Sequence, residues 1–363
     1  MDLAVQTEAV QTEAVETEAV RTETAQEEAV QAESAPTPGV AMKAIVQNGY
    51  GSPDVLRVAQ IDPPAVAADD EVLIRVRAAG VDRGVWHFMI GKPYAIRLAL
   101  GLRGPHGRVA GMDVAGTVVA VGSKVTRFAV GDDVFGVGRG SFAEFAVARE
   151  GKLARKPVGL SFEQAGVLAV SGVTALKAVR DVARVQPGQH VLVTGASGGV
   201  GTYAVQLAKA FGADVTGVCS TAKVDLVRSI GADHVVDYTR DDFAAGGRRY
   251  DVIIDVGGSS RLPQLRRVLT PRGTLVVVGG EGGGRWLGTG RPFSALALSI
   301  FVRQRLTMFI TKQGYAAMEA LSELVEAGKV TPVVGATYPL ADAPEALRLL
   351  DAGQARGKIA ITI

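Results

Sequence analysis

The segment from Val191 to Gly201 constrains the fold of this chain more than any other, because it reads VLVTGASGGVG. Three apolar residues come first, as in a buried parallel strand, and a glycine-rich turn leads into helical apolar spacing. A strand, a glycine turn and a helix N-terminus present open backbone amides and partial positive charge to a diphosphate group. We predict that a dinucleotide is bound by the turn residues Ala196, Ser197, Gly198, Gly199, Val200 and Gly201.

The turn departs from the G-x-G-x-x-G pattern at one position, where Ala196 replaces the first glycine. Alanine is the smallest replacement, and A-x-G-x-x-G still permits close packing of the helix on the strand. The alternative is a glycine-rich turn that binds nothing. Glycine weakens a turn unless something approaches the backbone closely, so four glycines in seven residues favour a ligand.

The composition favours a two-domain enzyme in a reducing compartment. The chain has 363 residues, of which 47% are hydrophobic, and no apolar run reaches the roughly 18–20 residues that span a bilayer. The N-terminus lacks the basic and apolar character of a signal peptide, and the single cysteine, Cys219, excludes an intrachain disulfide. We predict a cytoplasmic protein with no membrane partner.

The charge of the chain is unevenly distributed. Residues 1–40 hold nine acidic residues and one basic residue, a net charge of −8, which leaves +10 for the rest of a chain whose total is +2. A basic body is compatible with nucleic acid, but no basic stripe with interleaved aromatic residues is present, and aromatics make up only 6%. We predict no nucleic-acid partner and attribute the charge to binding of a polyanionic cofactor.

The first forty residues form an acidic repeat. Residues 4–33 repeat every five residues, as in AVQTE and AVETE, and this period matches neither a helix face nor a strand. Aromatic residues are absent, and SAPTPG has the composition of a linker. We interpret residues 1–40 as a disordered acidic tail that is either inert or serves docking or solubility.

The predicted secondary-structure pattern of the chain after residue 41 changes twice. Alternating and glycine-punctuated segments from Met42 onward predict an irregular, mostly antiparallel β domain with partial barrel character. From Leu160, strand and helix patterns alternate, beginning with a predicted helix over residues 161–182 that Ser161 and Gln164 open as a capping box. A helix is predicted from Tyr315 to Ala327, after which β-like segments return.

This order of segments resembles the medium-chain dehydrogenase/reductase superfamily from Met42 to Ile363. The matching landmarks, in order, are AAGVDRGVW, VAGMDVAGTVVAVG, VGDDVFG, SGVTAL, VTGASGGVG, GTLVVVGG and ARGKIAI. The resemblance implies an α/β fold that combines a GroES-like, partly open β-barrel with a Rossmann doubly wound parallel sheet. It places the GroES-like catalytic domain in residues 42–162 and 330–363, and the Rossmann NADP-binding domain in residues 163–329.

Zinc and zinc-free branches of this superfamily differ at positions that this chain contains. A catalytic zinc needs three protein ligands, usually Cys, His or carboxylate. Where the zinc branch has them, this chain has Asp82, Met112 with Asp113, and Val170, and the four-cysteine structural lobe is missing. The chain therefore resembles the zinc-free, zeta-crystallin-like quinone oxidoreductases, and we predict that it binds no zinc.

The segment after the predicted second strand of the Rossmann domain bears on the choice of cofactor. An acid near the end of that strand would bind the ribose of NAD, but the segment reads GVCSTAK. Ser220 can donate to a 2′-phosphate and Lys223 can neutralise it, while the nearest acid in sequence, Asp225, falls in the following helix. These residues favour NADPH over NADH.

Further cofactor contacts are implied by the resemblance alone. Lys223 and Tyr238 would lie against the 2′-phosphate and the adenosine. Thr174 would reach the nicotinamide side, Gly257 the adenine-side ribose, and Gly279 the nicotinamide. Arg356 and Lys358 would approach the diphosphate from the C-terminal segment.

Candidate catalytic residues lie between Asp82 and Tyr94. Asp82 replaces the asparagine usual in this branch, so it is either protonated or structural. His87 stands where zinc relatives place a proton-relay histidine, and Tyr94 can donate a hydrogen bond, although both also suit simple packing. The apolar residues Trp86, Phe88, Met89 and Trp286 favour a hydrophobic substrate.

The predicted function is NADPH-dependent reduction of a quinone or an α,β-unsaturated carbonyl, without zinc. An enoyl-thioester reductase or a zinc-independent alcohol dehydrogenase would have nearly the same sequence, and a non-catalytic NADPH-binding sensor or scaffold is the alternative from another class. We expect substrate specificity to vary in the glycine-rich loop from Glu281 to Gly290. By analogy with the family, we also expect a homodimer that pairs through the segment RLTMFITK.

Overall fold

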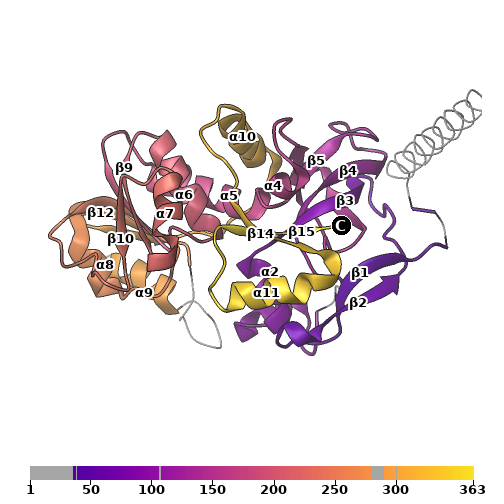
Figure 1. The fold of residues 1–363 in the computed structure, drawn as a ribbon, viewed down its shortest axis with the longest axis horizontal. Helices are drawn as coiled ribbons and strands as arrows, with labels where there is room; N and C mark the ends of the chain where they lie inside the picture. Colours follow the sequence, from indigo (N-terminus) through magenta and orange to yellow (C-terminus); the bar gives the residue numbers. More distant parts are fainter. Residues whose placement is uncertain (1–35, 38, 106–107, 280–289, 300) are drawn as a thin grey trace, which may run out of the picture.

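A computed structural model describes residues 36–37, 39–105, 108–279, 290–299 and 301–363 of the chain. Two lobes lie side by side, each built on its own β-sheet (Figure 1). We call them the Rossmann lobe, whose strands lie within residues 190–308, and the barrel lobe, whose main sheet draws on residues 71–155 and 334–362. This agrees with the predicted α/β architecture, while the domain boundaries remain a prediction. The predicted tail lies, except for its last few residues, outside the described residues.

The Rossmann lobe contains a six-stranded sheet in which every neighbouring pair is parallel. Its strand order is β10-β9-β8-β11-β12-β13, so the chain moves outward from β8 first on one side and then on the other. The carboxyl ends of β8 and β11 therefore flank the topological switch point at which ligands bind in such sheets. The strands are β8 (His190–Thr194), β9 (Asp214–Cys219), β10 (His234–Asp237), β11 (Tyr250–Asp255), β12 (Leu269–Val277) and β13 (Arg305–Met308).

Helices cover this sheet because their apolar faces match its buried residues. The helix after the glycine turn, α6, buries Tyr203, Val205 and Leu207 completely in the largest core cluster. It ends at Ala210, just before Gly212, which adopts a positive φ of 80°. The helices of the lobe are α5 (Ala169–Leu176), α6 (Gly199–Ala210), α7 (Val224–Ser229), α8 (Leu262–Val268), α9 (Gly290–Ser299) and α10 (Tyr315–Glu326).

The barrel lobe has a seven-stranded, mostly antiparallel sheet. Its order is β14-β15-β3-β4-β5-β7, with β6 also paired to β3, so the curved sheet is not closed between β14 and β7. The strands are β3 (Glu71–Val81), β4 (Asp113–Val121), β5 (Asp133–Val137), β6 (Phe145–Arg149), β7 (Leu153–Arg155), β14 (Val334–Pro339) and β15 (Lys358–Thr362). A separate antiparallel pair consists of β1 (Met42–Gln47) and β2 (Leu56–Ile61).

In the described part of the barrel lobe there are four α-helices, and one of them corrects a prediction. They are α2 (Arg83–Ile90), α3 (Arg97–Leu100), α4 (Phe162–Gly166) and α11 (Ala343–Asp351). The predicted capping box of Ser161 and Gln164 is present, but the helix predicted over residues 161–182 is broken into α4, α5 and a π-helical segment, Lys177–Ala183. The first break follows Gly166, whose backbone packs so closely on Ala78 that a Cβ would lie 3.0 Å from the Ala78 carbonyl oxygen.

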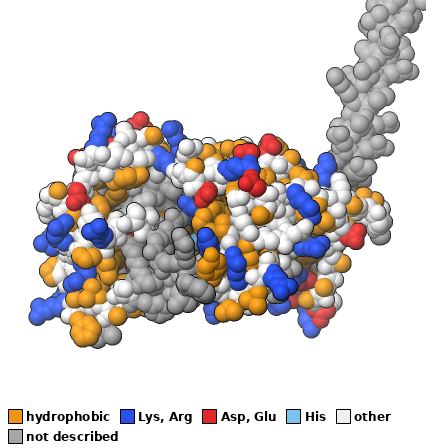
Figure 2. Space-filling model, turned by 90° about the horizontal axis from the view of Figure 1, so that it is seen from below, with side chains coloured by type: hydrophobic (Ala, Val, Ile, Leu, Met, Phe, Trp, Pro, Cys, Tyr) orange, Lys and Arg blue, Asp and Glu red, His pale blue; other side chains and the backbone are white. Residues whose placement is uncertain are grey.

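The two lobes share one hydrophobic core. The cluster that holds α5 and α6 also includes Ala115 and Phe135 of the barrel sheet, and α10 contacts both α5 and β7. On the face seen in Figure 2, Lys and Arg side chains are scattered over both lobes among hydrophobic and acidic ones. None of the described helices is long and apolar enough to cross a membrane.

Candidate functional site

The glycine turn lies at the switch point of the parallel sheet. Gly195 follows β8 with a φ of 65°, and the amide of Ala196 donates to the Val218 carbonyl of β9. Gly198 caps α6 without a side chain, so the first-turn amides of this helix have no acceptor inside it. A Cβ on Gly201 would lie only 2.0 Å from the Gly195 carbonyl oxygen, which shows why the turn excludes larger residues. The turn thus presents a bare backbone cradle that fits a diphosphate group.

The departure at Ala196 is explained by packing. Its side chain is fully buried, and its Cβ lies 3.1 Å from the position of a Cβ on Gly217 in β9. Alanine thus fills a small space against the neighbouring strand. A glycine-to-alanine change at this position is therefore compatible with the cradle.

Two further predicted glycines meet the turn at the same edge of the sheet. Gly257 follows β11, and its amide donates to the Thr194 carbonyl and side-chain oxygens at 3.2 Å each. Gly279 follows β12, and a Cβ there would lie 2.1 Å from the Val256 carbonyl oxygen. Thr194 in turn donates to the buried Asp255 carboxylate at 2.6 Å. Hydrogen bonds and close backbone packing therefore hold the carboxyl ends of β8, β11 and β12 together around the cradle.

The end of β9 carries the residues predicted to select the cofactor. Ser220 is the N-cap of the short 3₁₀ turn Thr221–Lys223, and Tyr238, 63% exposed, follows β10 next to it. An acid does approach this point: Asp237 of β10 accepts hydrogen bonds from Thr221 and Thr239. These bonds, the one from Thr221 foremost, hold the pKa of the Asp237 carboxyl below its usual value. Sequence reasoning missed Asp237 because it compared only residues following β9.

Lys223 bridges the two lobes. Its ammonium donates to the carbonyls of Gly353 (2.9 Å) and Ala355 (2.7 Å), which lie between α11 and β15. Burial lowers the pKa of Lys223, and the charge of Arg356 lowers it further. Lys223 therefore stands close to a second cation at the end of β9.

Lys358 lies beside the cradle, but its charge is directed elsewhere. Its side-chain stem flanks Gly199, where a Cβ would meet the lysine Cδ at 3.0 Å, and the amide of the preceding residue, Gly357, donates to the Ser197 carbonyl. The ammonium is almost fully buried and donates to Asp113 (3.3 Å) and Ser171 (3.1 Å). In this structure the lysine stem packs against the turn while the ammonium is bound to Asp113 and Ser171, so a direct contact of Lys358 with the diphosphate remains a prediction.

The residues at the positions of the zinc ligands of related dehydrogenases lie close together in this structure. The Val170 amide donates to Asp113 at 2.7 Å, while Asp82 caps α2 by accepting a bond from the Val85 amide. Burial, opposed by Lys358 and reinforced by the Asp82 charge, raises the pKa of Asp113 to about 7. The cation next to Asp113 is the lysine ammonium, and the described residues include no group of three His, Cys, Asp or Glu side chains that could hold a metal ion.

The three candidate catalytic residues surround α2, but each also has a structural task. Asp82 is buried as the helix cap, with its second carboxylate oxygen lacking a hydrogen-bond partner. The His87 Nδ1 donates to the Lys92 carbonyl at 2.8 Å, and the Arg97 guanidinium lies 4.8 Å from the centre of the Tyr94 ring. The predicted nicotinamide contact, Thr174, donates instead to the Val170 carbonyl at 2.7 Å and lies near Thr311.

One predicted substrate-lining residue is wrong. Met89 is only 1% exposed and belongs to a core cluster with Val85 and Leu347, so it cannot contact a substrate. Trp86 and Phe88 are half-buried on the same helix. Trp286 and the predicted specificity loop, up to residue 289, lie outside the described residues.

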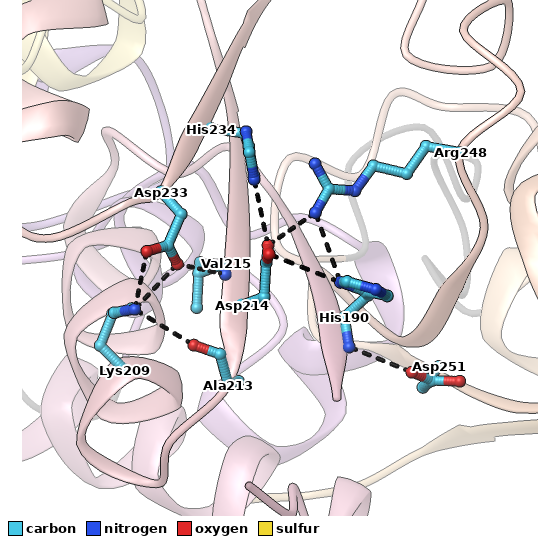
Figure 3. Close-up of polar contacts among 9 residues, drawn as sticks. All are labelled: His190, Lys209, Ala213, Asp214, Val215, Asp233, His234, Arg248 and Asp251. Atoms are coloured by element: carbon cyan, nitrogen blue, oxygen red, sulfur yellow. Dashed lines mark hydrogen bonds and ion pairs between the residues drawn. The ribbon is translucent and has the colours of Figure 1, made fainter. Parts of the chain in front are cut away.

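A polar cluster at the amino ends of the parallel strands has a structural role. Asp214, at the start of β9, receives the Arg248 guanidinium at 2.7 Å and faces His190 and His234 on the neighbouring strands (Figure 3). Because these residues stand at the amino ends of the strands, they lie away from the cradle. They fasten the beginnings of β8, β9 and β10 together.

Comparison with known proteins agrees with this geometry. Family models described as "Alcohol dehydrogenase GroES-like domain" and "Zinc-binding dehydrogenase" match residues 68–158 and 230–361. The bovine mitochondrial NAD(P)H oxidoreductase RTN4IP1 is 33% identical, with 89% of each chain covered. The Arabidopsis thaliana chloroplast envelope quinone oxidoreductase homolog is 31% identical over 89% of this chain and 99% of its own. A quinone oxidoreductase structure from Coxiella burnetii superposes with a TM-score of 0.79 at 27% identity, covering 89% of this chain and 99% of its own.

The chain therefore belongs to the medium-chain dehydrogenase/reductase superfamily of oxidoreductases. Within that superfamily it lies on the quinone oxidoreductase branch, and its cofactor is a nicotinamide dinucleotide. The two relatives are described as mitochondrial and as belonging to the chloroplast envelope, so the cytoplasmic location stays a prediction.

Proposed function

We propose that this protein uses NADPH to reduce a hydrophobic quinone or α,β-unsaturated carbonyl without zinc. The observation that carries the proposal is the bare backbone cradle at the switch point, with Lys223 beside it and Asp237 already engaged by threonines. The relatives named above are described as quinone and NAD(P)H oxidoreductases, and a tomato relative, 31% identical, as a 2-methylene-furan-3-one reductase. These names are compatible with both substrate classes.

The chain's own residues would perform three tasks in this reaction. The first-turn amides of α6 bind the diphosphate, and the locked turns at Gly257 and Gly279 hold the dinucleotide across the strand ends. When bound, NADPH supplies the hydride. Hydride addition leaves negative charge on the substrate oxygen, which hydrogen-bond donors must stabilise and a proton must neutralise. We assign the donor role to Tyr94 or to the Nε2 of His87, and a structural role to Asp82, which caps α2.

Preference for NADPH follows from charge. A 2′-phosphate adds a dianion that Ser220 can contact and that the cations Lys223 and Arg356 can neutralise. The two acids nearest the end of β9 are already engaged, since Asp237 accepts hydrogen bonds from Thr221 and Thr239 and Asp225 lies within α7 beside Arg228. Selection of NADPH therefore rests on Lys223 and its neighbours.

The proposal is tested by assaying cofactor oxidation against quinones, enones, enoyl thioesters and aldehydes, with NADPH and with NADH. We expect turnover of quinones or enones and a preference for NADPH that Lys223→Met abolishes. The matched control is Lys156→Met, because the Lys156 ammonium also donates to two carbonyls, those of Pro157 and Leu160, but within its own loop. Tight NADPH binding without turnover would support a sensor or scaffold instead, and preference for enoyl thioesters would assign the alternative enzyme class.

We also propose a homodimer that pairs through β13. This strand lies at the edge of the six-stranded sheet, and the apolar side chains of Phe301 and Ile310 flanking it are 83% and 76% exposed. An exposed edge strand with apolar flanks is suited to pairing across a two-fold axis. Light scattering at several concentrations tests this; a mass of one chain at all of them would contradict it.

A further inference from the structure

An open cavity of about 480 Å³ lies at the amino ends of β12 and β13, on the side of the parallel sheet away from the cradle. The last turn of α8, the first residues of β12 and the segment between α9 and β13 form its walls. Three of the residues that line the cavity are arginines, and we therefore call it the arginine pocket. Its polar lining consists of Arg266, Arg267, Arg303 and Gln304, and Pro263 and Pro271 lie beside them.

Gln304 fixes the geometry of the arginine pocket. Its side-chain oxygen accepts a hydrogen bond from the Nε of Arg266 at 3.1 Å, and its side-chain nitrogen donates to the Arg266 carbonyl at 3.0 Å. The same nitrogen lies 3.4 Å from the carbonyl oxygens of Leu269 and Thr270. These bonds close the carboxyl end of α8 and engage only the Nε of Arg266, so within the described residues its two terminal nitrogens are available to an anion.

The positive charge of the arginine pocket is not balanced by nearby residues in the sequence. The side chains of Arg267 and Arg303 are exposed, and within the described residues neither guanidinium has a hydrogen bond or an ion pair. Between Asp255 and Glu319 the chain holds nine Arg and Lys residues and a single acid, Glu281, a net charge of +8. Planar guanidinium groups pair with carboxylates and phosphates through two parallel hydrogen bonds, so the pocket suits a ligand that carries such groups.

The acidic tail, residues 1–40, is a segment of this chain whose charge matches the arginine pocket. Its net charge of −8 is equal and opposite to that of the segment that contains the pocket. Its glutamates recur every five residues from Glu8 to Glu33, and Arg21 is its only base. Because these carboxylates are tethered to every copy of the pocket, they are favoured over a free phosphate ligand.

The point at which the tail joins the folded body decides which glutamates can reach the pocket. The strand that follows the tail, β1, and the helix that borders the pocket, α8, lie at opposite ends of the molecule (Figure 1). A folded body of this size has a radius of gyration of about 20 Å and is therefore roughly 50 Å across. Glu33 lies nine residues before Met42 and can extend at most about 30 Å from it, whereas Glu18 lies 24 residues before Met42 and can extend about 80 Å. Only the first half of the tail is therefore long enough to reach the pocket.

We propose that the first half of the acidic tail binds in the arginine pocket of its own chain, with Glu8, Glu13 and Glu18 paired to the arginines. This inference does not depend on the proposed function, because the pocket lies away from the cradle. A single exposed pair of this kind contributes little, but the tether holds the two partners at an effective concentration on the order of a millimolar. Several weak pairs therefore suffice for binding, and the bound tail covers a basic face that would otherwise attract polyanions.

Energy transfer between two dyes tests the proposal on the full chain. A donor and an acceptor are attached to Gln11→Cys in the tail and to Ala245→Cys, while the buried Cys219 is not labelled. Ala245 is exposed in a loop whose Phe243 packs with Leu265 of α8. Labelled chains are mixed with an excess of unlabelled chains, so that only transfer within one chain is measured. We expect efficient transfer at about 20 mM salt and a loss of at least about half of it at about 500 mM, because the Debye length falls from about 20 Å to about 4 Å.

Two tail variants with the same change of charge distinguish the two halves of the tail. Replacing three glutamates of the first half by glutamine should lower the transfer at low salt about twofold or more, because the carboxylates that reach the pocket are lost. Replacing three glutamates of the second half is the matched control and should leave the transfer unchanged. The two variants are Glu8→Gln/Glu13→Gln/Glu18→Gln and Glu27→Gln/Glu28→Gln/Glu33→Gln.

A variant of the pocket tests the other side of the contact. Arg267→Gln/Arg303→Gln should lower the transfer as much as the first tail variant does. The control is Arg57→Gln, at an exposed position on β2 of the barrel lobe, which should have no effect. Because Arg303 lies two residues before β13, light scattering must show that the pocket variant keeps the native molecular mass. If the mass changes, Arg267→Gln alone, on α8, decides the result.

Heparin, a polyanion, reports without any label whether the pocket is covered. On a heparin column, the variant of the first half of the tail should elute at higher salt than the native chain, because the basic face is exposed. The variant of the second half should elute with the native chain. Adding Arg267→Gln/Arg303→Gln to the first-half variant should abolish its shift.

Three results would overturn the proposal. Equal energy transfer in the two tail variants would show that the tail acts only through its net charge. Transfer that disappears on dilution with unlabelled chains would assign the pocket to the tail of a second copy. Equal retention of the native chain and the first-half variant on heparin would show that the pocket is open, and would leave it to a phosphate-bearing ligand.

Discussion

Replacing Lys358 by methionine tests how the buried charges behind the cradle are balanced. The lysine side chain is 1% exposed and its partner Asp113 is fully buried, with the ammonium 3.3 Å from the carboxylate. Methionine keeps the apolar stem that flanks Gly199 but removes the charge. Removing one partner of a buried ion pair costs about 3–5 kcal/mol as long as the other stays ionised. We expect this full loss in Lys358→Met only at alkaline pH.

Acidification should restore part of the lost stability. Burial already raises the pKa of Asp113 to about 7, with Asp82 adding to the effect, and loss of the Lys358 charge raises it further. The groups that face Asp113 are Lys358 from β15, Asp82 before α2, the Val170 amide from α5 and the Tyr203 hydroxyl from α6. Ser171 of α5 accepts a hydrogen bond from the same Lys358 ammonium.

The sign of the pH effect follows from linkage. Asp113 titrates near pH 4 when unfolded and at a higher pH when folded, so its contribution to stability falls as the pH rises from about 4 through its folded pKa. Each pH unit in that window is worth about 1.4 kcal/mol. Lowering the pH from 8.5 to 6 should therefore stabilise Lys358→Met by roughly 3 kcal/mol and the native chain, whose Asp113 gains its proton only near pH 7, by roughly 1.4 kcal/mol, so the difference between the two should shrink by about 2 kcal/mol.

Thermal unfolding followed by circular dichroism at pH 6 and pH 8.5 measures this difference. The double variant Lys358→Met/Asp113→Asn removes both charges and should be more stable than the single variant at pH 8.5, with little dependence of the difference on pH. Equal destabilisation of Lys358→Met at both pH values, together with no recovery in the double variant, would refute the reasoning.

Three further predictions follow from contacts described above. Ser161→Ala removes the capping box of α4 and should lower the free energy of unfolding by about 1 kcal/mol, measured by denaturant titration, with no effect if the cap is unimportant. Gly201→Ala places a Cβ 2.0 Å from the Gly195 carbonyl oxygen and should weaken NADPH binding in calorimetry about a hundredfold, as loss of two charge-assisted bonds predicts; unchanged affinity would show that the turn does not bind the diphosphate. Cys219, whose pKa burial raises to about 11, should react with iodoacetamide at pH 8 on the order of a hundredfold more slowly than an exposed cysteine, and mass spectrometry showing equal rates in native and unfolded protein would contradict its burial.

The features that sequence alone predicted are those determined by neighbours in the chain. The cradle is predictable because its strand, turn and helix occupy consecutive residues, and the capping box because Ser161 and Gln164 are three residues apart. The parallel strands are predictable from short apolar runs between helical patterns. The sequence also identified Ala196 as part of the turn, and the structure adds why a side chain is tolerated at this position.

The features that escaped prediction depend on long-range contacts. Lys358 meets Asp113 across 245 residues, and Lys223 meets Ala355 across 132, so no local pattern announces either contact. Met89 was misplaced because an apolar helix residue suits the core as well as a substrate surface. Asp237 escaped notice because the acid nearest to the end of β9 in space comes from the adjacent strand.

The position of β15 has a consequence for how the protein is made. In the barrel sheet this strand lies between β14 and β3, and it pairs with Val81 and its neighbours in β3. In the sequence, however, all strands of the Rossmann lobe come after β3 and before β15. On the ribosome, the Rossmann lobe has all its strands available before β15 emerges, whereas the second half of one edge of β3, residues 78–81, stays unpaired until then. Exposed strand edges promote aggregation. The barrel lobe is therefore the part of the molecule that most needs chaperone protection during synthesis, even though its first strands are translated before those of the Rossmann lobe.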